Sequence, residues 1–132
     1  MVASDTYGMT LKDRPEFASK PKPLCFPPTA KVSEAVVAMS ERNFGSVVIV
    51  DDDQKVIGIA TERDVMKKLV AVNKDAQQTS LSEIMTHDPR LARETDDVVD
   101  WLRIMSNERF RRLPVVDDEG RIQVIFTQGD FV

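Results

Sequence analysis

Residues 44–64 read FGSVVIVDDDQKVIGIATERD, and residues 110–130 read FRRLPVVDDEGRIQVIFTQGD. The two stretches are 66 residues apart and align without a gap. When the alignment is extended over residues 24–66 and 90–132, it contains 43 pairs, of which 11 are identical. An ungapped repeat of this length indicates that the chain contains two copies of one structural unit.

Each copy predicts the same order of elements. Apolar residues at helical spacing come first, and two short apolar runs separated by an acidic turn follow them. In the first copy this pattern predicts a helix near Val32, strands at 47–50 and 55–60, and a second helix that begins at Thr61. The second helix is expected to have an apolar face made of Val65, Met66, Leu69, Val70 and Val72.

The predicted fold class is α/β (α+β), a tandem of β-α-β-β-α repeats with pseudo-twofold symmetry. We expect an N-terminal lead-in over residues 1–19, made irregular by prolines, a first repeat over 20–80 and a second over 81–132. Residues 81–85 predict a helical turn that opens the second copy. Because a half of this size buries little apolar surface alone, the two sheets are expected to pack together.

Composition excludes several classes of protein. The 132 residues, 42% hydrophobic and 30% charged, are typical of one globular domain, and the chain has neither a long apolar run nor the pattern of a signal peptide. A cytoplasmic location is therefore expected. The single Cys25, expected to pack against apolar neighbours, and the single His87 exclude an internal disulfide and a Cys-rich zinc site.

Charge gives little support to nucleic-acid binding. The net charge of -4 provides no general attraction for phosphates. The N-terminal arm is nevertheless locally basic, through Lys12, Arg14, Lys20 and Lys22.

A Thr-x-x-Asp pattern follows the second strand of each copy, as Thr61 with Asp64 and Thr127 with Asp130. One explanation is a capping box, in which the two side chains satisfy backbone groups where a helix begins. The other is a ligand site, in which the helix start and the hydroxyl bind phosphate while the carboxylate accepts two ribose hydroxyls. A nucleotide fits the second explanation better than inorganic phosphate does, because the carboxylate repels phosphate.

Residues 58–64, GIATERD, and residues 111–117, RRLPVVD, resemble the two signature segments of cystathionine beta-synthase (CBS) domain pairs, also called Bateman modules. With EIMT at 83–86, the resemblance covers about residues 20–132. It implies tandem β-α-β-β-α repeats that bind AMP, ADP, ATP, NAD or S-adenosylmethionine in clefts between the repeats. It also implies assembly into a homodimer.

The resemblance further implies which residues meet in each cleft. In the first cleft, Thr61 binds phosphate, Asp64 binds ribose, and the groups around phosphate and adenine are Arg111, Arg112, Thr86 and the backbone near Leu113 and Pro114. The second cleft combines Thr127 and Asp130 with Gly45, Ser46 and Val47. The first cleft is expected to bind more tightly, because guanidinium groups stand there in place of Gly45 and Ser46.

The second copy departs from this pattern in two places. Gln123-Val124 replaces Ile57-Gly58, so the second cleft is expected to lose a glycine that lets the backbone approach a ligand. The sequence also ends two residues after Asp130, which leaves no second helix for this copy. Truncation of the chain and degeneracy of the second cleft are both open explanations.

These observations favour a regulatory nucleotide-binding module that senses energy or redox state in signal transduction and signals to a partner protein. No nucleophile with a base and an orienting group is visible, so no enzymatic activity is expected. The alternatives are a structural dimerisation module with empty clefts and an RNA-binding accessory; an aromatic content of 6% disfavours the latter. Trp101 is expected in the core or at a dimer interface.

Overall fold

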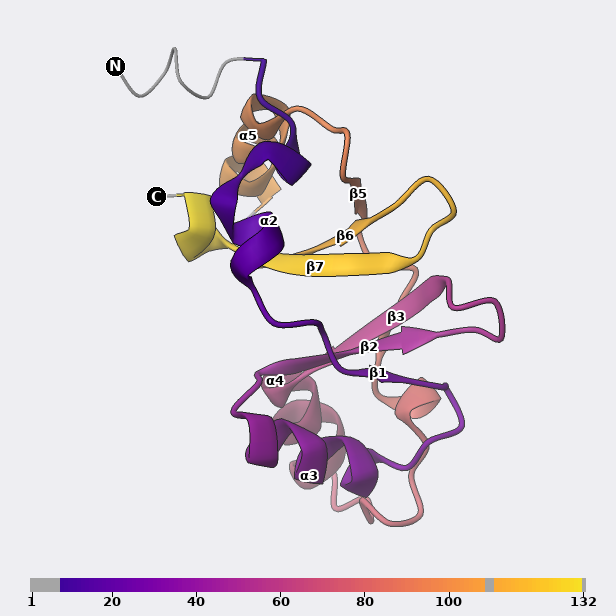
Figure 1. The fold of residues 1–132 in the computed structure, drawn as a ribbon. Coiled ribbons are helices and arrows are strands. Elements are labelled where there is room, and N and C mark those ends of the chain that lie inside the picture. The colour runs from indigo at the N-terminus through magenta and orange to yellow at the C-terminus, as the bar shows by residue number, and fades with distance from the viewer. Residues whose placement is uncertain (1–7, 109–110, 132) are drawn as a thin grey trace. The chain divides into compact units, whose positions relative to one another are not determined.

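The computed structural model describes residues 8–108 and 111–131, without the side chains of Gln128 and Phe131. The chain divides into two compact units (Figure 1). The first-copy unit comprises Pro23–Pro89, and the second-copy unit comprises Met1–Lys22 together with Arg90–Val132.

The first-copy unit is a four-stranded sheet with two helices on one side (Figure 1). Its strands have the order β1-β2-β3-β4, with β1 parallel to β2 and the other pairs antiparallel. The elements are β1 (Cys25–Phe26), α3 (Val32–Arg42), β2 (Ser46–Val50), β3 (Val56–Thr61), α4 (Glu62–Val65), the π-helical η2 (Met66–Val70), the 3-10 helix η3 (Leu81–Glu83) and β4 (Thr86–His87).

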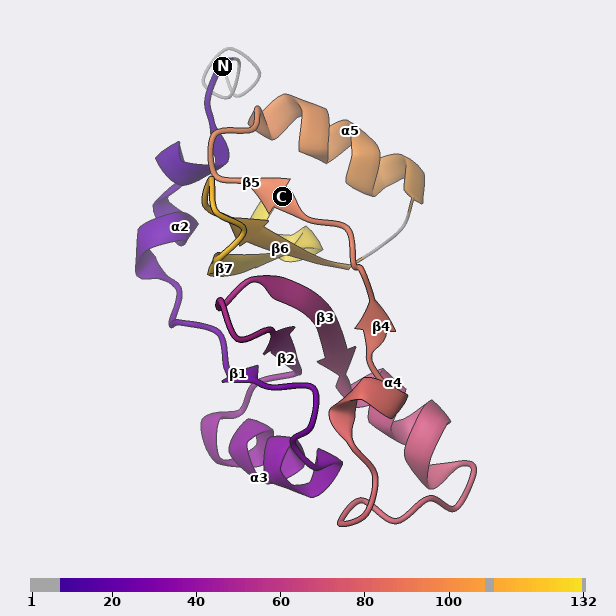
Figure 2. The same cartoon turned by 90° about the vertical axis from the view of Figure 1, so that its right-hand side faces the viewer.

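The second-copy unit repeats this plan with a three-stranded sheet of order β5-β6-β7. Its elements are the 3-10 helix η1 (Leu11–Asp13), α2 (Pro15–Ser19), β5 (Ala92–Arg93), α5 (Val98–Glu108), β6 (Arg112–Val116), β7 (Ile122–Thr127) and the 3-10 helix η4 (Gln128–Phe131). Figure 2 shows α5 over one face of this sheet. Val50 pairs with Val56 in one hairpin and Val116 pairs with Ile122 in the other, so the strand register confirms the 66-residue repeat.

The first helix of each copy buries the same three positions. They are Val32, Ala35 and Met39 in α3, and Val98, Trp101 and Met105 in α5. This spacing places all three on one side of a helix, where they join the core of their own unit. Trp101 is 7% exposed and its indole N–H donates to Asp96 Oδ2 at 2.8 Å, which confirms the expectation of a core position.

The short segment that precedes each copy in the sequence packs into the other unit. Residues 10–13, TLKD, precede the first copy, but Leu11 lies in the core of the second-copy unit. Residues 80–83, SLSE, precede the second copy, but Leu81 lies in the core of the first-copy unit. We call these two segments the exchanged lead-ins.

Backbone hydrogen bonds show that the exchanged lead-ins occupy equivalent places. The Leu11 N–H donates to the carbonyl of Asp96 at 2.9 Å, and the Leu81 N–H donates to that of Ala30 at 2.8 Å. Ala30 and Asp96 are themselves equivalent positions of the repeat. A capping box closes each segment, because Asp13 accepts from the Thr10 N–H and Glu83 from the Ser80 N–H. These backbone hydrogen bonds hold the pKa of each acid below its usual value.

Two expectations about the N-terminal part of the chain are wrong. The lead-in is ordered over Leu11–Asp13 and Pro15–Ser19, because Pro15 is the first residue of α2, where a helix does not need its N–H. Cys25 is exposed, because alternate residues of a strand face opposite sides and Phe26 takes the inward position of β1.

The predicted apolar face of the second helix is also wrong. Met66, Val70 and Val72 are 56%, 62% and 55% exposed, whereas Leu69 is buried. After Val65 the helix continues as a π-helical turn, which changes the angle between successive side chains and directs only Leu69 into the core. No helix within residues 8–108 and 111–131 is long and apolar enough to cross a membrane.

Candidate functional site

Thr61 and Asp64 form a capping box where α4 begins. The Thr61 N–H and hydroxyl donate to Asp64 Oδ2 at 2.9 and 3.1 Å, and Thr61 Oγ1 is 3.2 Å from the Asp64 nitrogen, from which it accepts. The other carboxylate oxygen, Oδ1, forms an ion pair with Lys68 Nζ at 3.1 Å. The capping-box explanation is therefore confirmed for the first copy, and the Asp64 side chain retains 15% exposure with a cation beside it.

Thr127 and Asp130 repeat this arrangement with a different cation. The Thr127 N–H and hydroxyl donate to Asp130 Oδ2 at 2.7 and 3.2 Å. The Lys20 ammonium pairs with the same oxygen and donates to the Ile125 carbonyl at 3.1 Å. Burial raises the pKa of Asp130, but the hydrogen bonds from Lys20 and the Thr127 N–H outweigh burial, so this pKa lies below its usual value.

Strand register determines which other residues lie beside each Thr-x-x-Asp. Ser46 is directly opposite Thr61 in the β2–β3 hairpin, and Arg112 is directly opposite Thr127 in the β6–β7 hairpin. Side chains of directly opposite residues leave an antiparallel pair on the same face. Within the units, a hydroxyl therefore neighbours the first Thr-x-x-Asp and a guanidinium neighbours the second.

The remaining predicted site residues differ in exposure. Thr86 is exposed in β4, opposite Ile59, and Arg111 is exposed at the start of the second hairpin. The Gly45 carbonyl accepts from the Glu62 N–H at 3.1 Å. The three apolar candidates, Val47, Leu113 and Pro114, are buried. Both predicted clefts combine residues of the two units and remain predictions.

Gly58 has a packing role inside its own unit. A Cβ at this position would overlap Met85 Sδ and lie 3.1 Å from its Cγ and Cε. Met85 is itself 6% exposed and part of the core. The space at Gly58 is therefore filled by Met85, which gives this glycine a packing reason; the approach of a ligand to its backbone remains a prediction. Val124, which replaces it in the second copy, is buried in its own core.

The acidic hairpin turns have a structural explanation as well. Asp51 Oδ1 accepts from the N–H groups of Asp53 and Lys55 at 2.9 Å, and Asp117 repeats this pattern in the second hairpin. A side chain that bonds nearby backbone in this way stabilises a turn. Among the described residues, no three His, Cys, Asp or Glu side chains form a group that could hold a metal ion.

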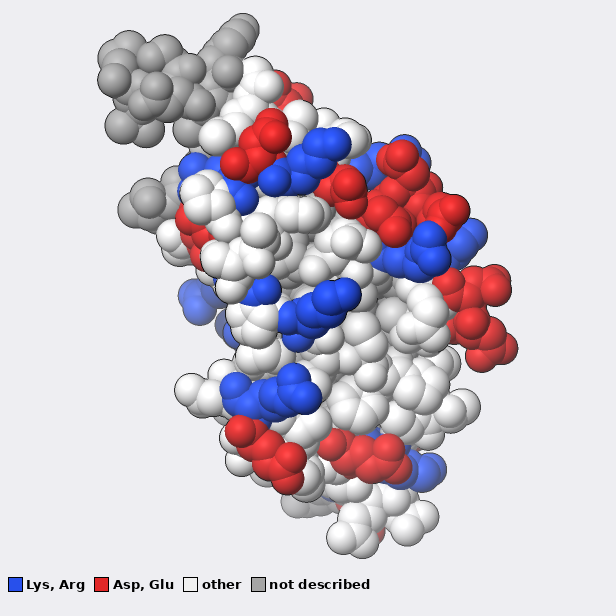
Figure 3. Space-filling view, in the orientation of Figure 1, with Lys and Arg blue, Asp and Glu red and all other residues white. Residues whose placement is uncertain are grey.

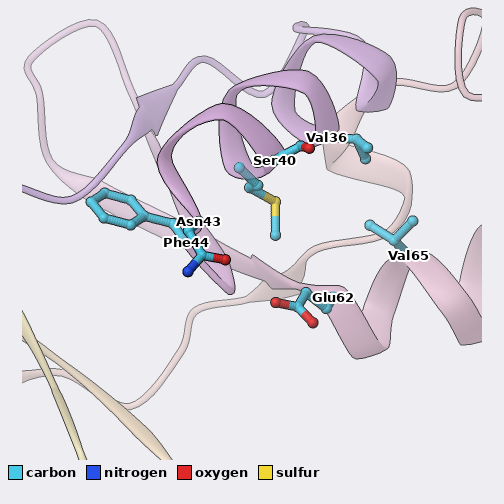
Figure 4. Close-up of a pocket in the computed structure, with 7 residues that line it drawn as sticks. Val36, Ser40, Asn43, Phe44, Glu62 and Val65 are labelled. Carbon is cyan, nitrogen blue, oxygen red and sulfur yellow. The ribbon is translucent and has the colours of Figure 1, made fainter.

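A pocket of about 310 Å³ lies between α3 and the beginning of α4 (Figure 4). Its lining residues are Val36, Met39, Ser40, Asn43, Phe44, Glu62 and Val65. Figure 4 shows Val36 on α3 and Val65 on α4 at the same side of this space. The sequence predicted none of these as site residues; Phe44, which is identical to Phe110 in the second copy, is the one signal that the repeat offered.

Comparison of sequences identifies the repeat. Residues 16–71 and 81–132 match the CBS domain. A similar protein is the uncharacterized 17.7 kDa protein in the bps2 3' region of Acidianus ambivalens, 37% identical over 103 residues, which are 78% of this chain and 61% of that protein. The chain spans 50% to 61% of the length of three such relatives.

Solved structures show the same architecture. The CBS domain pair of protein MJ0100, in complex with 5'-methylthioadenosine and S-adenosyl-L-methionine, has a TM-score of 0.75 and 31% identity over 92% of this chain and 91% of that one. The fold is also that of the CBS domain protein PAE2072 from Pyrobaculum aerophilum complexed with AMP, with a TM-score of 0.76 and 23% identity over 89% and 88% of the two chains. The chain therefore belongs to the CBS domain family and carries a CBS domain pair.

Proposed function

We propose that this chain is a cytoplasmic regulatory module that binds an adenine nucleotide of the AMP, ADP, ATP or NAD type and catalyses no reaction. The observation that carries the proposal is the repeated carboxylate with a lysine beside it, Asp64 with Lys68 and Asp130 with Lys20. A carboxylate accepts hydrogen bonds from two hydroxyls of a ribose, and a lysine beside it attracts a nearby phosphate. The two ligands of the MJ0100 domain pair both contain adenosine, which supports this ligand class.

In this proposal the ligand acts by differential affinity. Asp64 accepts the ribose hydroxyls in the first cleft, while Arg111 and Arg112 bind phosphate there. A nucleotide that favours one arrangement of the protein tenfold shifts the equilibrium by about 1.4 kcal/mol, which is enough to tilt a balanced pair of states. A partner protein then reads energy or redox state from the population of the two arrangements.

Replacing Asp64 with alanine is expected to weaken nucleotide binding at least about tenfold, because a hydrogen bond to a charged group contributes roughly 1.5–3 kcal/mol. Titration calorimetry of the wild-type chain with AMP, ATP, NAD and S-adenosylmethionine identifies the ligand, and the Asp64→Ala variant tests the site. Asp53→Ala is the matched control, because it removes an exposed acid from a hairpin turn of the same unit. Equal, weak heats from the wild type and Asp64→Ala would contradict the proposal.

The first-copy unit presents an apolar surface that fits a second copy of this chain. We define it as the helical face, formed by Val36, Val37, Met66 and Val70, which are 37%, 56%, 56% and 62% exposed. It adjoins the pocket between α3 and α4. Val36 belongs to both the helical face and the pocket lining, and exposed apolar surface beside a hollow is a candidate protein contact surface.

Both helices that carry the helical face expose charges of both signs. Glu34, Glu41 and Arg42 are exposed on α3, and Glu62, Arg63 and Lys67 are exposed on the second helix. In a twofold interface the same patch serves both subunits, so the acids and bases of one copy lie near those of its partner. Opposite charges then meet across the interface. We therefore assign the homodimer contact to the helical face.

The double variant Val37→Asp with Met66→Asp is expected to be monomeric at a concentration at which the wild type is dimeric. Each change places a carboxylate in an apolar contact, and an unpaired buried charge opposes association. Light scattering coupled to size-exclusion chromatography measures the mass. Thr29→Asp, at an exposed loop position of the same unit, is the control and should remain dimeric. A dimeric double variant would exclude the helical face, and a monomeric wild type would exclude the homodimer.

A dimerisation module with empty clefts is the second candidate function, and the helical face is the observation that favours it. Mass spectrometry of an acid extract of the purified protein separates the two, because a co-purified adenine nucleotide is expected only from a sensor. The RNA-binding alternative has less support. Figure 3 shows Lys and Arg interspersed with Asp and Glu on the face in view, and within the basic arm Arg14 pairs with Glu16 and Lys20 with Asp130.

A further inference from the structure

Lys20 reaches the second Thr-x-x-Asp from a distant part of the chain. It is 110 residues away from Asp130 in sequence, yet its ammonium pairs with the carboxylate and also donates to the Ile125 carbonyl. The Lys20 and Asp130 side chains are 25% and 17% exposed. An ion pair that is largely withdrawn from water and fixed by a second hydrogen bond is better defined than one on a free surface. The Lys20 side chain is therefore held in place beside the Thr127–Asp130 segment.

The repeat shows which position Lys20 takes. A shift of 66 residues places Lys20 on Thr86 and Ile125 on Ile59. In the first-copy unit Thr86 lies opposite Ile59 in the sheet, and in the second-copy unit Lys20 bonds to Ile125. The second copy thus has a cation where the first has a neutral hydroxyl, at a position that the resemblance assigns to the ligand.

The two carboxylates obtain their cations in different ways. Lys68 is four residues after Asp64 on the same helix; it also donates to a backbone carbonyl, that of Ile84 at 3.3 Å, but its side chain is 47% exposed. Lys20 comes from another segment, and its side chain is about half as exposed. Because water screens an exposed charge more strongly, Lys20 neutralises its carboxylate more effectively than Lys68 does.

The contacts of Asp130 leave room for a ligand. The described donors to its carboxylate, which are the Thr127 N–H, the Thr127 hydroxyl and Lys20, all reach Oδ2, whereas the Arg14 guanidinium donates to the Asp130 backbone carbonyl. A carboxylate has about four lone-pair positions on its two oxygens, so Oδ1 can still accept a ribose hydroxyl.

We infer that Lys20 is a specificity-determining residue of the Thr127–Asp130 site, where it neutralises Asp130 and makes the site select adenosine ligands that carry a phosphate. This inference rests on the proposed function, because it presumes that the Thr-x-x-Asp segments bind nucleotide. Without Lys20, the Asp130 carboxylate repels a phosphate but still accepts the hydroxyls of an uncharged adenosine derivative. The preference for phosphate, rather than binding as such, is therefore the property that Lys20 controls.

The test compares AMP with 5'-methylthioadenosine, which lacks a phosphate, by titration calorimetry on the full chain. In the Lys20→Met variant we expect AMP affinity at one of the two sites to fall about tenfold or more, while affinity for 5'-methylthioadenosine stays within about twofold of the wild type. Lys20→Arg keeps the charge and should retain the preference for AMP. Lys22→Met removes an exposed lysine two residues away and is the matched control.

The outcomes separate this inference from the proposed function. If the wild type binds neither AMP nor 5'-methylthioadenosine, the proposed function fails and the inference falls with it. If the wild type binds both and Lys20→Met leaves the AMP isotherm unchanged, or weakens both ligands equally, only the inference is overturned. Thermal unfolding monitored by circular dichroism confirms that each variant is folded, and a preference that survives in Lys20→Arg shows that charge is responsible.

Discussion

The Leu11→Ala variant is expected to unfold with a free energy about 2–5 kcal/mol lower than that of the wild type, the usual cost of removing a fully buried leucine side chain. Leu11 has no exposed surface and lies in the core of the second-copy unit, which also contains Trp101 and Phe126. Urea denaturation followed by circular dichroism measures the total change. Amide hydrogen exchange should show the loss of protection in β6, for example at Val115.

The exchanged lead-ins provide the control for this experiment. Leu81→Ala should have a similar effect located in the first-copy unit, for example at Ile49, because Leu81 is 1% exposed in that core. Lys12→Ala changes the exposed neighbour of Leu11 and should stay within about 0.5 kcal/mol of the wild type. If Leu11→Ala reduced protection first at Ile49, the assignment of residues 10–13 to the second-copy unit would be wrong.

Gly58→Ala is expected to lower the free energy of unfolding by about 1–3 kcal/mol, the cost of forcing an extra methyl group into a packed core. The added Cβ would overlap the Met85 thioether. Methionine is flexible, so the side chain moves rather than the backbone, and the effect should stay in this range. Urea denaturation of the variant measures it.

The cause can be isolated with a double-mutant cycle. In a Met85→Ala background the space beside Gly58 is empty, so Gly58→Ala should cost clearly less there than in the wild type. Gly129→Ala is a second control, because a Cβ at Gly129 meets only Thr127 Oγ1, at the ordinary distance of 3.8 Å. An equal cost of Gly58→Ala in both backgrounds would show that Met85 is not the reason for the glycine.

Most of the elements that were predicted correctly follow from local sequence patterns. The repeated apolar runs predicted both hairpins, and the helical spacing of Val32, Ala35 and Met39 identified a buried face. The second helix was predicted less well, because the π-helical turn at Met66–Val70 follows from packing and not from local preference. Apolar residues on that helix were assigned to the core although their surface is exposed.

In the candidate site, too, local patterns were predicted and contacts between distant residues were not. Thr61, Asp64, Thr127 and Asp130 could be recognised because each pair lies within four residues of sequence. The ion pair between Lys20 and Asp130 spans most of the chain, so no local pattern predicts it. The packing of Met85 against Gly58 was missed for a related reason, since the two residues are close in space and distant in sequence.

The exchanged lead-ins determine the order in which the two units can fold during translation. The first-copy unit is contiguous and ends at Pro89, so it can close while the rest of the chain is still being translated. Residues 10–13 are translated before the first-copy unit, but the strands that enclose Leu11 follow about a hundred residues later. Leu11 and Phe17 therefore remain without their core partners until β6 and β7 have been translated.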